Sequence, residues 1–300
     1  MVALPAVDYS RELDAVERAA RLAGTAILRH YRGAGVRIEI KPDQSPVTEA
    51  DLDANQIIVD LLRREFPDDG ILSEELPDDG QRFAKRRVWI IDPLDGTRDF
   101  VARTDQFCVH VGLAVDQVAV VGAVYQPVAG RLYSARAGAG AKVREDVRED
   151  VRGEASQDGH ADAVAAADGK IVRTSTTVLP AEMRAGVSRL NASGRLGACL
   201  AATGFGRNAV AMGASVKYMA LARGELDLVI NLSPGEQEWD TCAPEVVIRE
   251  AGGTLTDGDG RPFRYNQRDT AHRRGSLASN GACHPALLDL LRPHFAADTV

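Results

Sequence analysis

The stretch WIIDPLDGT, residues 89–97 of this 300-residue chain, predicts a buried strand that is followed by candidate functional side chains. Its apolar start is typical of a strand that delivers Asp92 to the edge of a sheet. Asp95 follows one turn later, so both carboxylates point toward one spot. Two carboxylates held that close repel each other unless a cation lies between them, and oxygen ligands suit Mg²⁺. Gly96 and Thr97 then open a helix, where free backbone N–H groups favour an anion such as phosphate.

A purely structural explanation of this stretch is also available. Asp92 or Asp95 would cap a helix, and Gly96 would serve as a turn residue. Three further carboxylates favour chemistry instead, because each stands beside a predicted strand or helix end: Asp51, Glu74 and Asp240. The sequence therefore predicts five carboxylates converging from four segments.

Regular apolar spacing predicts the elements around this stretch. Steps of three and four residues predict a helix over residues 9–32, and Thr48 is placed to cap a second helix that ends near residue 66. The other predicted elements are strands at 71–73 and 87–91, a three-strand meander over 107–136, a strand at 171–174, helices at 180–192 and 214–223, a strand at 226–231, and helices at 240–251 and 285–291.

These elements group into two halves, which predicts an α/β (α+β) fold. Residues 1–140 form an N-terminal α+β half that carries most of the acidic residues, and residues 170–300 form a C-terminal α/β half with Asp240. Strands alternating with helices in the second half favour a parallel or mixed sheet. Residues 141–169 repeat VRED twice and lose periodicity, which predicts an exposed loop of mixed charge.

Composition excludes several classes of protein. Apolar residues make up 45% of the chain and charged residues 26%, as in an ordinary globular protein. The net charge of −7 disfavours binding to a nucleic acid polymer or an anionic membrane. The longest apolar run, residues 107–125, is interrupted by polar residues, so no membrane span is expected. The N-terminus lacks the pattern of a secretory signal, which favours a cytoplasmic location.

Cysteine and histidine give no metal-binding spacing. The four cysteines are far apart and form no CxxC pair, so they are expected to be reduced core thiols. The six histidines are scattered, and surface or core positions are expected for them.

Five motifs, taken in order, resemble the lithium-sensitive, magnesium-dependent phosphatase superfamily, which includes inositol monophosphatases and 3'(2'),5'-bisphosphate nucleotidases. The resemblance covers about residues 10–295. It implies a layered α/β/α/β/α sandwich and phosphomonoester hydrolysis by metal-activated water, with two or three Mg²⁺ ions. The motifs lie at residues 46–51, 73–75, 89–97, 213–224 and 238–253.

The resemblance also implies a set of metal ligands. The positions that match Glu74 and Asp92 hold a first metal, together with the backbone carbonyl of Leu94. The positions that match Asp92, Asp95 and Asp240 hold a second metal. Asp92 is therefore expected to contribute its charge to both.

Catalysis and phosphate binding are implied for neighbouring residues. The positions that match Asp51 and Thr97 act together on the attacking water, and Glu74 supports them through its metal. Gly96 and Thr97 are expected to hold the phosphate.

Finer features favour the bisphosphate nucleotidase branch, which would convert adenosine 3',5'-bisphosphate to AMP and phosphate. Arg98-Asp99 follows the DGT triplet, and the GASVKY segment at 213–218 resembles the stretch where Ser215 and Lys217 approach the substrate. Lys217 would offset the charge of a second phosphate, although a surface helix cation is the alternative. One departure is that RTST at 173–176 lacks the histidine usual in nucleotidases, which puts the adenosine contacts in doubt.

Three other functions remain open at this stage. The chain could be an inositol-1-monophosphatase, a related sugar-phosphate or histidinol-phosphate phosphatase, or a non-catalytic phosphate or nucleotide sensor. A small-molecule phosphate ester is the expected partner, and a homodimer is left open.

Overall fold

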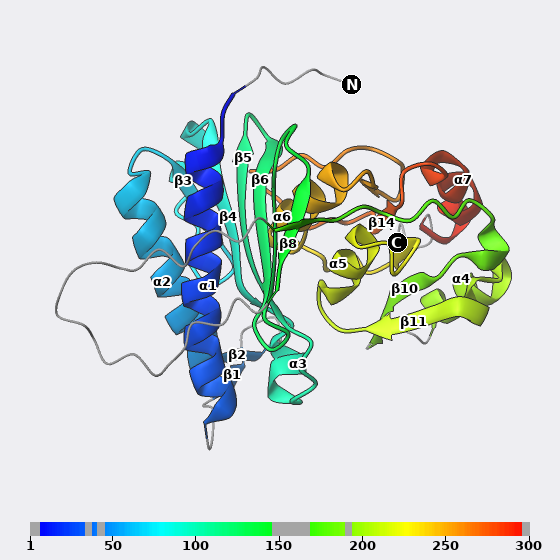
Figure 1. Ribbon diagram of the computed structural model, residues 1–300, viewed down its shortest axis with the longest axis horizontal. Helices are drawn as coiled ribbons and strands as arrows, with labels where there is room; N and C mark the ends of the chain where they lie inside the picture. The colour runs from blue at the N-terminus through cyan, green and yellow to red at the C-terminus, as the bar shows by residue number, and fades with distance from the viewer. Residues whose placement is uncertain (1–6, 34–37, 41–45, 146–168, 190–193, 296–300) are drawn as a thin grey trace.

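The computed structural model describes residues 7–33, 38–40, 46–145, 169–189 and 194–295, and these build five alternating layers of helix and sheet (Figure 1). Helices α1 (Ser10–Arg32) and α2 (Glu49–Glu65) cover one face of a large sheet. Helices α5 (Val216–Ala222) and α6 (Glu238–Glu250) lie between that sheet and a smaller one. Helices α4 (Arg195–Thr203) and α7 (His284–Phe295) pack on the far side of the smaller sheet. The layers confirm the predicted α/β/α/β/α sandwich.

The large sheet has seven strands in the described part of the chain, in the order β3-β4-β5-β6-β7-β8-β9. Strand β3 runs parallel to β4, and all later pairs are antiparallel, so the predicted meander is confirmed. The strand bounds are Gly70–Ser73 (β3), Arg87–Asp95 (β4), Cys108–Val115 (β5), Val118–Gln126 (β6), Arg131–Arg136 (β7), Ala141–Arg144 (β8) and Lys170–Ile171 (β9).

The smaller sheet has the order β11-β10-β12-β14-β13. Strand β10 pairs in parallel with β11 and β12, whereas β14 is antiparallel to both its neighbours, so this sheet is mixed as expected. The strand bounds are Ala185–Ser188 (β10), Ala209–Met212 (β11), Leu228–Asn231 (β12), Thr254–Asp257 (β13) and Ser276–Ser279 (β14). The other described strands and α-helices are β1 (Ile38–Ile40), β2 (Pro46–Thr48), α3 (Thr97–Val101), α4 (Arg195–Thr203) and α7 (His284–Phe295).

The first two helices follow directly from the sequence. Apolar residues spaced at three and four positions on α1 are fully buried against the sheet, among them Val16, Ala23 and Ile27. Thr48 caps α2, because its hydroxyl accepts the Ala50 N–H at 3.2 Å. These contacts fix the N-terminal helices on the sheet that carries the acidic motif.

The second half departs from the prediction in one wrong element and in several missing ones. The predicted helix over 180–192 is wrong: the chain makes a 3₁₀ turn at Pro180–Glu182 and then strand β10. Because β10 hydrogen-bonds to strands on both sides, pairing outweighs the weak local helix preference of its small residues. Helix α4 and strands β11, β13 and β14 were not predicted.

The segment between the halves is only partly described. The predicted strand over 171–174 is reduced to β9, whose two residues pair with β8. Strand β8 takes the first residues of the predicted loop over 141–169 into the large sheet. Residues 146–168 of that loop lie outside the described residues.

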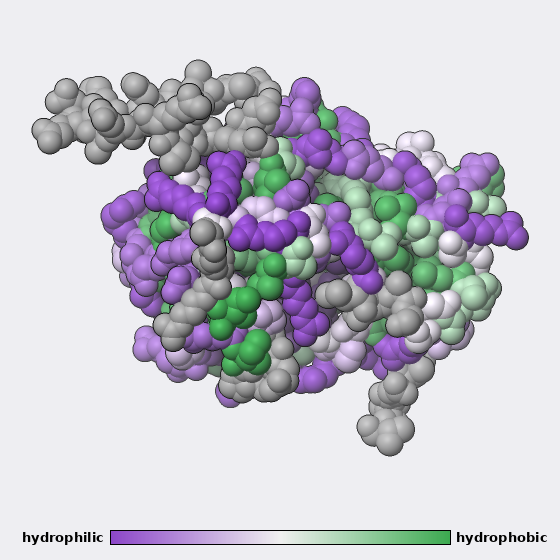
Figure 2. Space-filling model, turned by 90° about the horizontal axis from the view of Figure 1, so that it is seen from below, coloured by the Kyte–Doolittle hydropathy of each residue, from purple (hydrophilic) through white to green (hydrophobic). Residues whose placement is uncertain are grey.

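Nothing in the described helices suggests a membrane span, since none is both long and apolar enough to cross a bilayer. Figure 2 shows the molecule from the side on which β1, β2 and α3 lie in Figure 1. Hydrophobic side chains gather there in small patches separated by hydrophilic ones. The exposed apolar residues of these elements include Ile38, Ile40 and Val101.

His284 is the first residue of α7 and lies far from the acidic motif. Its titration makes the free energy of unfolding depend on pH. Its ring nitrogens lie 3.0 Å from the Thr256 hydroxyl and 2.8 Å from the Ser279 hydroxyl, and burial lowers its pKa to about 4. Between an unfolded pKa of about 6.5 and the folded value, only the unfolded chain takes up the proton. Stability is therefore present above pH ~6.5 and falls as the pH drops toward 4, by about 3 kcal/mol.

Urea unfolding at several pH values checks this expectation. His284→Gln should remove the part of the acid dependence described above, whereas His294→Gln, on the same helix, should keep the wild-type dependence. Equal pH dependence in wild type and His284→Gln would contradict the assignment.

Candidate functional site

The acidic site begins where the parallel pairing of β3 and β4 ends. Ser73 of β3 is paired with Ile91 of β4, so the residues that follow this last pair emerge side by side. The Glu74 N–H donates to the Ile91 carbonyl at 3.2 Å, which places Glu74 directly beyond β3. Asp92 is the next residue of β4. The prediction that Glu74 directly follows its strand is confirmed, whereas Asp92 was expected after a strand ending at residue 91 and lies inside β4, which runs on to Asp95.

Strand β4 continues past Asp92 through an irregularity in its pairing with β5. The register shifts between Asp92 and Asp95. The Leu94 N–H donates to Asp92 Oδ1 at 3.0 Å, so the chain turns around the first carboxylate before it reaches the second. The irregular pairing therefore brings Asp92 and Asp95 to the same side.

Helix α6 supplies the third carboxylate of the group. One oxygen each from Asp92, Asp95 and Asp240 lies within 4.8 Å of the others. Asp240 is the third residue of α6, and its Oδ2 accepts the Gln237 N–H at 2.6 Å, as in a capping box. The carboxylate is thus held by the helix start while it faces the sheet. This oxygen-only group could hold a hard divalent cation.

Two glycines let α6 lie directly on the sheet. Gly112 of β5 and Gly122 of β6 are register partners. A Cβ at Gly122 would lie 2.5 Å from the Ala243 carbonyl oxygen, and one at Gly112 would lie 2.7 Å from Cys242 Sγ. Only residues without a side chain permit this approach, which sets the position of Asp240 relative to β4.

The electrostatics of the group favour a bound cation. Burial, and then the charge of Glu74, raises the pKa of Asp92 well above its usual range, and Asp95 and Asp240 add to this effect. Burial, and then the charge of Asp95, raises the pKa of Asp240 in the same way. A cation would relieve this repulsion.

Asp51 and Thr97 form a separate pair beside the group. Asp51 is 1% exposed, and its Oδ2 accepts the Thr48 N–H at 2.8 Å and the Thr48 hydroxyl at 2.6 Å. Its Oδ1 accepts the Thr97 hydroxyl at 3.1 Å, and that hydroxyl lies 3.3 Å from the Leu94 carbonyl oxygen. Asp51, like Asp240, is thus both a capping residue of its helix and a member of the site.

The segment before α5 closes the other side of the site. Gly96 has φ of +93°, and a Cβ there would lie 2.8 Å from the Ala214 side chain. The Ser215 N–H donates to Asp95 Oδ2 at 2.6 Å. Lys217 is buried rather than on the surface, and its Nζ donates to the Ala214 carbonyl at 2.6 Å. The structure therefore contradicts the alternative that Lys217 is a surface cation.

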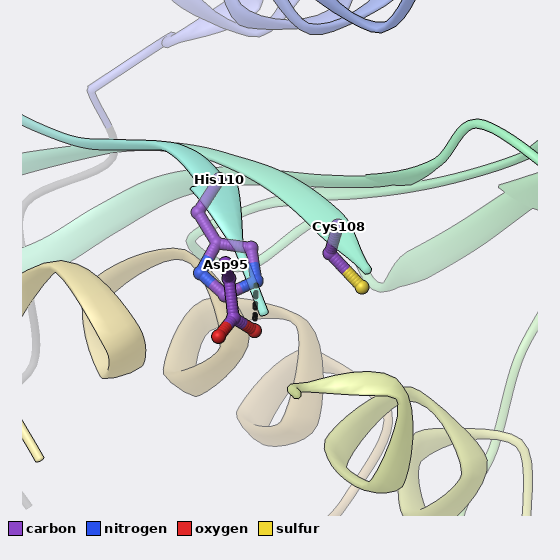
Figure 3. A group of neighbouring side chains, drawn as sticks. All are labelled: Asp95, Cys108 and His110. Carbon is purple, nitrogen blue, oxygen red and sulfur yellow. Dashed lines mark ion pairs between the residues drawn. The ribbon is translucent and has the colours of Figure 1, made fainter. Parts of the chain in front are cut away.

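Three further side chains near the site were not predicted from the sequence. His110 and Cys108 lie on β5 beside Asp95, in a group whose ligand atoms are within 4.8 Å of one another (Figure 3). Two polar side chains at alternate positions of an otherwise apolar strand were a signal that could have found them. Arg189 follows β10, and its Nη1 donates to Asp99 Oδ1 at 3.3 Å. No local pattern marks that pairing, because it spans 90 residues.

Comparisons with known proteins agree with the geometry. The model of the inositol monophosphatase family matches residues 8–295. A 3'(2'),5'-bisphosphate nucleotidase CysQ from Escherichia coli is 32% identical over 264 residues, which cover 86% of this chain and 95% of the relative. A histidinol-phosphatase from Streptomyces coelicolor is 30% identical over 292 residues, which cover 96% and 99%. Among solved structures, CysQ from Bacteroides thetaiotaomicron has a TM-score of 0.75 and 29% identity, covering 91% of this chain and 98% of that one.

Proposed function

Because the chain belongs to the inositol monophosphatase family, we propose that it hydrolyses small phosphate monoesters with the help of Mg²⁺, and that 3',5'-bisphosphate nucleotides are its substrates. The observation that carries this proposal is the group of oxygens from Asp92, Asp95 and Asp240 within 4.8 Å. Such carboxylate ligands suit Mg²⁺ rather than softer ions. The proposed ligands of a neighbouring ion are Glu74, Asp92 and the Leu94 carbonyl.

The residues around this carboxylate group would have separate roles in the reaction. Bound Mg²⁺ would lower the pKa of water and clamp phosphate oxygens. Asp51 accepts a hydrogen bond from the Thr97 hydroxyl, which leaves the hydroxyl oxygen free to accept a hydrogen bond from the attacking water. Two hydrogen bonds from Thr48 hold the Asp51 carboxylate in place, so Asp51 and Thr97 are oriented before the substrate arrives. Gly96 and Thr97 would hold the phosphate beside it.

The proposed specificity for bisphosphates is supported by a buried cation and by the activity for which a relative is named. Lys217 is 8% exposed and belongs to the segment that also binds Asp95 through Ser215, so its charge is available at the site without being screened by solvent. The Escherichia coli relative, named as a 3'(2'),5'-bisphosphate nucleotidase, supports the same substrate class.

A histidinol-phosphate phosphatase is the second candidate. It is favoured by the relative from Streptomyces coelicolor, which aligns with 96% of this chain. The absence of a histidine from RTST at 173–176 departs from the nucleotidase pattern and so favours an alternative to the first candidate.

Phosphate release from parallel substrates tests the proposal. Adenosine 3',5'-bisphosphate, histidinol phosphate and inositol 1-phosphate would be compared with Mg²⁺ and with EDTA. The proposal expects metal-dependent release with the highest kcat/KM for the bisphosphate. A preference for histidinol phosphate would support the second candidate, and no release from any ester would favour a sensor.

Lys217→Met tests the charge argument with little change of volume. Loss of one charged hydrogen bond, about 1.5–3 kcal/mol, should lower kcat/KM for the bisphosphate about tenfold or more. The same variant should change kcat/KM for inositol 1-phosphate much less, because that ester has no second phosphate. Lys142→Met, on β8, serves as the control. Equal losses on both esters would contradict a role in recognising the second phosphate.

Two further details of the proposal follow from the family resemblance, namely two or three Mg²⁺ ions and inhibition by lithium. A cytoplasmic location and a homodimer are proposed in addition. Metal counting on the purified protein and its mass in solution would test the first and last of these.

A further inference from the structure

His110 is placed between two acceptors beside the proposed Mg²⁺ site. Its side chain is fully buried on β5. Its Nδ1 lies 3.2 Å from the Trp239 carbonyl oxygen, and its Nε2 lies 3.4 Å from Asp95 Oδ2. The Nε2 atom has no hydrogen-bond partner among the described residues.

This arrangement leaves a lone pair without a suitable neighbour. A carbonyl oxygen only accepts hydrogen bonds, and so does an ionised carboxylate. With the proton on Nδ1, the Nε2 lone pair faces Asp95, and with the proton on Nε2, the Nδ1 lone pair faces Trp239. Both neutral forms of the ring therefore place a lone pair against an acceptor. A positive charge at Nε2, either a second proton or a metal ion, resolves the conflict. With a metal ion at Nε2, Nδ1–H donates to the carbonyl as metal-bound histidines commonly do.

Cys108 adds a third donor to the same spot. It lies two residues before His110 on β5, so both side chains project from the same face of the strand, as Figure 3 shows. Cys108 is the register partner of Asp95 on β4. The sulfur, the nitrogen and a carboxylate oxygen all lie within 4.8 Å of one another. All three side chains come from two adjacent strands, which hold them rigidly.

The mixed donors differ from those of the acidic group. Thiolate and imidazole ligands select borderline ions such as Zn²⁺ over Mg²⁺, and one sulfur, one nitrogen and one oxygen leave a fourth tetrahedral position open. We propose that Asp95, Cys108 and His110 form a second, zinc-class metal site in this protein.

The site would share a ligand with the proposed Mg²⁺ site. Asp95 belongs to both groups of ligand atoms. Zinc bound by Cys108 and His110 would draw this carboxylate toward β5 and away from Asp92 and Asp240. The proposed consequence is inhibition by Zn²⁺ at concentrations far below those of Mg²⁺, because nitrogen and sulfur ligands bind zinc much more strongly.

Cobalt binding tests the site directly and without substrate. Co²⁺ replaces Zn²⁺ in such sites, and a thiolate ligand gives it an intense charge-transfer absorption that oxygen and nitrogen ligands do not. The EDTA-treated and dialysed full chain would be titrated with Co²⁺ and then with Zn²⁺. Four variants would be compared, two in the site and two matched controls at buried positions outside it: Cys108→Ser, His110→Asn, Cys199→Ser and His284→Gln.

The proposal expects the charge-transfer band in the wild type and in both controls, its loss when Zn²⁺ is added, and its absence from Cys108→Ser. Affinity for Co²⁺ should fall about tenfold or more in His110→Asn, because even groups that only orient a ligand have effects of that size. No band in the wild type would overturn the proposal, and this outcome requires no variant to fold. A band that persists in Cys108→Ser, or unchanged affinity in His110→Asn, would overturn it as well. None of these results depends on whether the protein hydrolyses a phosphate ester.

Discussion

Asp92→Asn is expected to lower metal-dependent phosphate release about a thousandfold, or roughly 4 kcal/mol of transition-state stabilisation. Asp92 is 1% exposed and is the proposed ligand of both metals, so its loss removes charge from each. The same change should stabilise the metal-free protein, because burial and the charge of Glu74, which raise the pKa of Asp92, both disfavour a carboxylate at this position. Opposite effects on activity and stability distinguish a site carboxylate from a structural one.

Turnover at limiting Mg²⁺ and thermal unfolding with and without Mg²⁺ check both parts. Mg²⁺ at about 100 times its Kd should add about 2.7 kcal/mol to the stability of the wild type and much less to that of the variant. Asp116→Asn, the same chemical change on an exposed turn, should leave activity and the Mg²⁺ effect unchanged. Wild-type turnover of Asp92→Asn at limiting Mg²⁺ would show that the site is assigned incorrectly.

Thr97→Val is expected to lower kcat by roughly a hundredfold to ten-thousandfold, the usual effect of losing a proton-transfer group. The variant keeps the size of the side chain and removes the hydroxyl that donates to Asp51 Oδ1. Because the proposed metal ligands are untouched, Mg²⁺ affinity should stay near that of the wild type. Thr97→Ser restores the hydroxyl and should recover most of the rate.

Steady-state kinetics and Mg²⁺ titration separate these effects. A fall in kcat with unchanged Mg²⁺ affinity supports the role of Thr97 in orienting water. If the affinity for Mg²⁺ fell by as large a factor as kcat, the result would instead indicate that Thr97 supports the metal centre through Leu94.

The first half of the chain was predictable because its signals are local. Thr48 caps the helix that it precedes, and the capping box also fixes Asp51. Glu74 and Asp92 lie next to each other because they directly follow Ser73 and Ile91, the last residue pair of the parallel strands β3 and β4. Such features depend on spacing within a few residues, which a single sequence displays directly.

The second half was harder because its elements depend on distant partners. The residues of β10 become a strand only through pairing with β11 and β12, and nothing in their own sequence prefers that form over a helix. His110 was expected in an ordinary core or surface position. Its relation to Asp95 and Trp239 arises from packing between β4, β5 and α6, and one sequence does not reveal such packing.

The paired glycines under α6 have a consequence for ion size. Gly112 and Gly122 let the backbone of α6 touch the sheet, so the gap between Asp92 and Asp240 is set by main-chain contact and not by compressible side chains. Mg²⁺ requires oxygens at about 2.0–2.1 Å, whereas Ca²⁺ takes them at about 2.3–2.6 Å. In the proposed site, the discrimination between Mg²⁺ and Ca²⁺ would therefore depend on two glycines that contact neither the ion nor the substrate. Substitution of either glycine by alanine would widen the gap between Asp92 and Asp240.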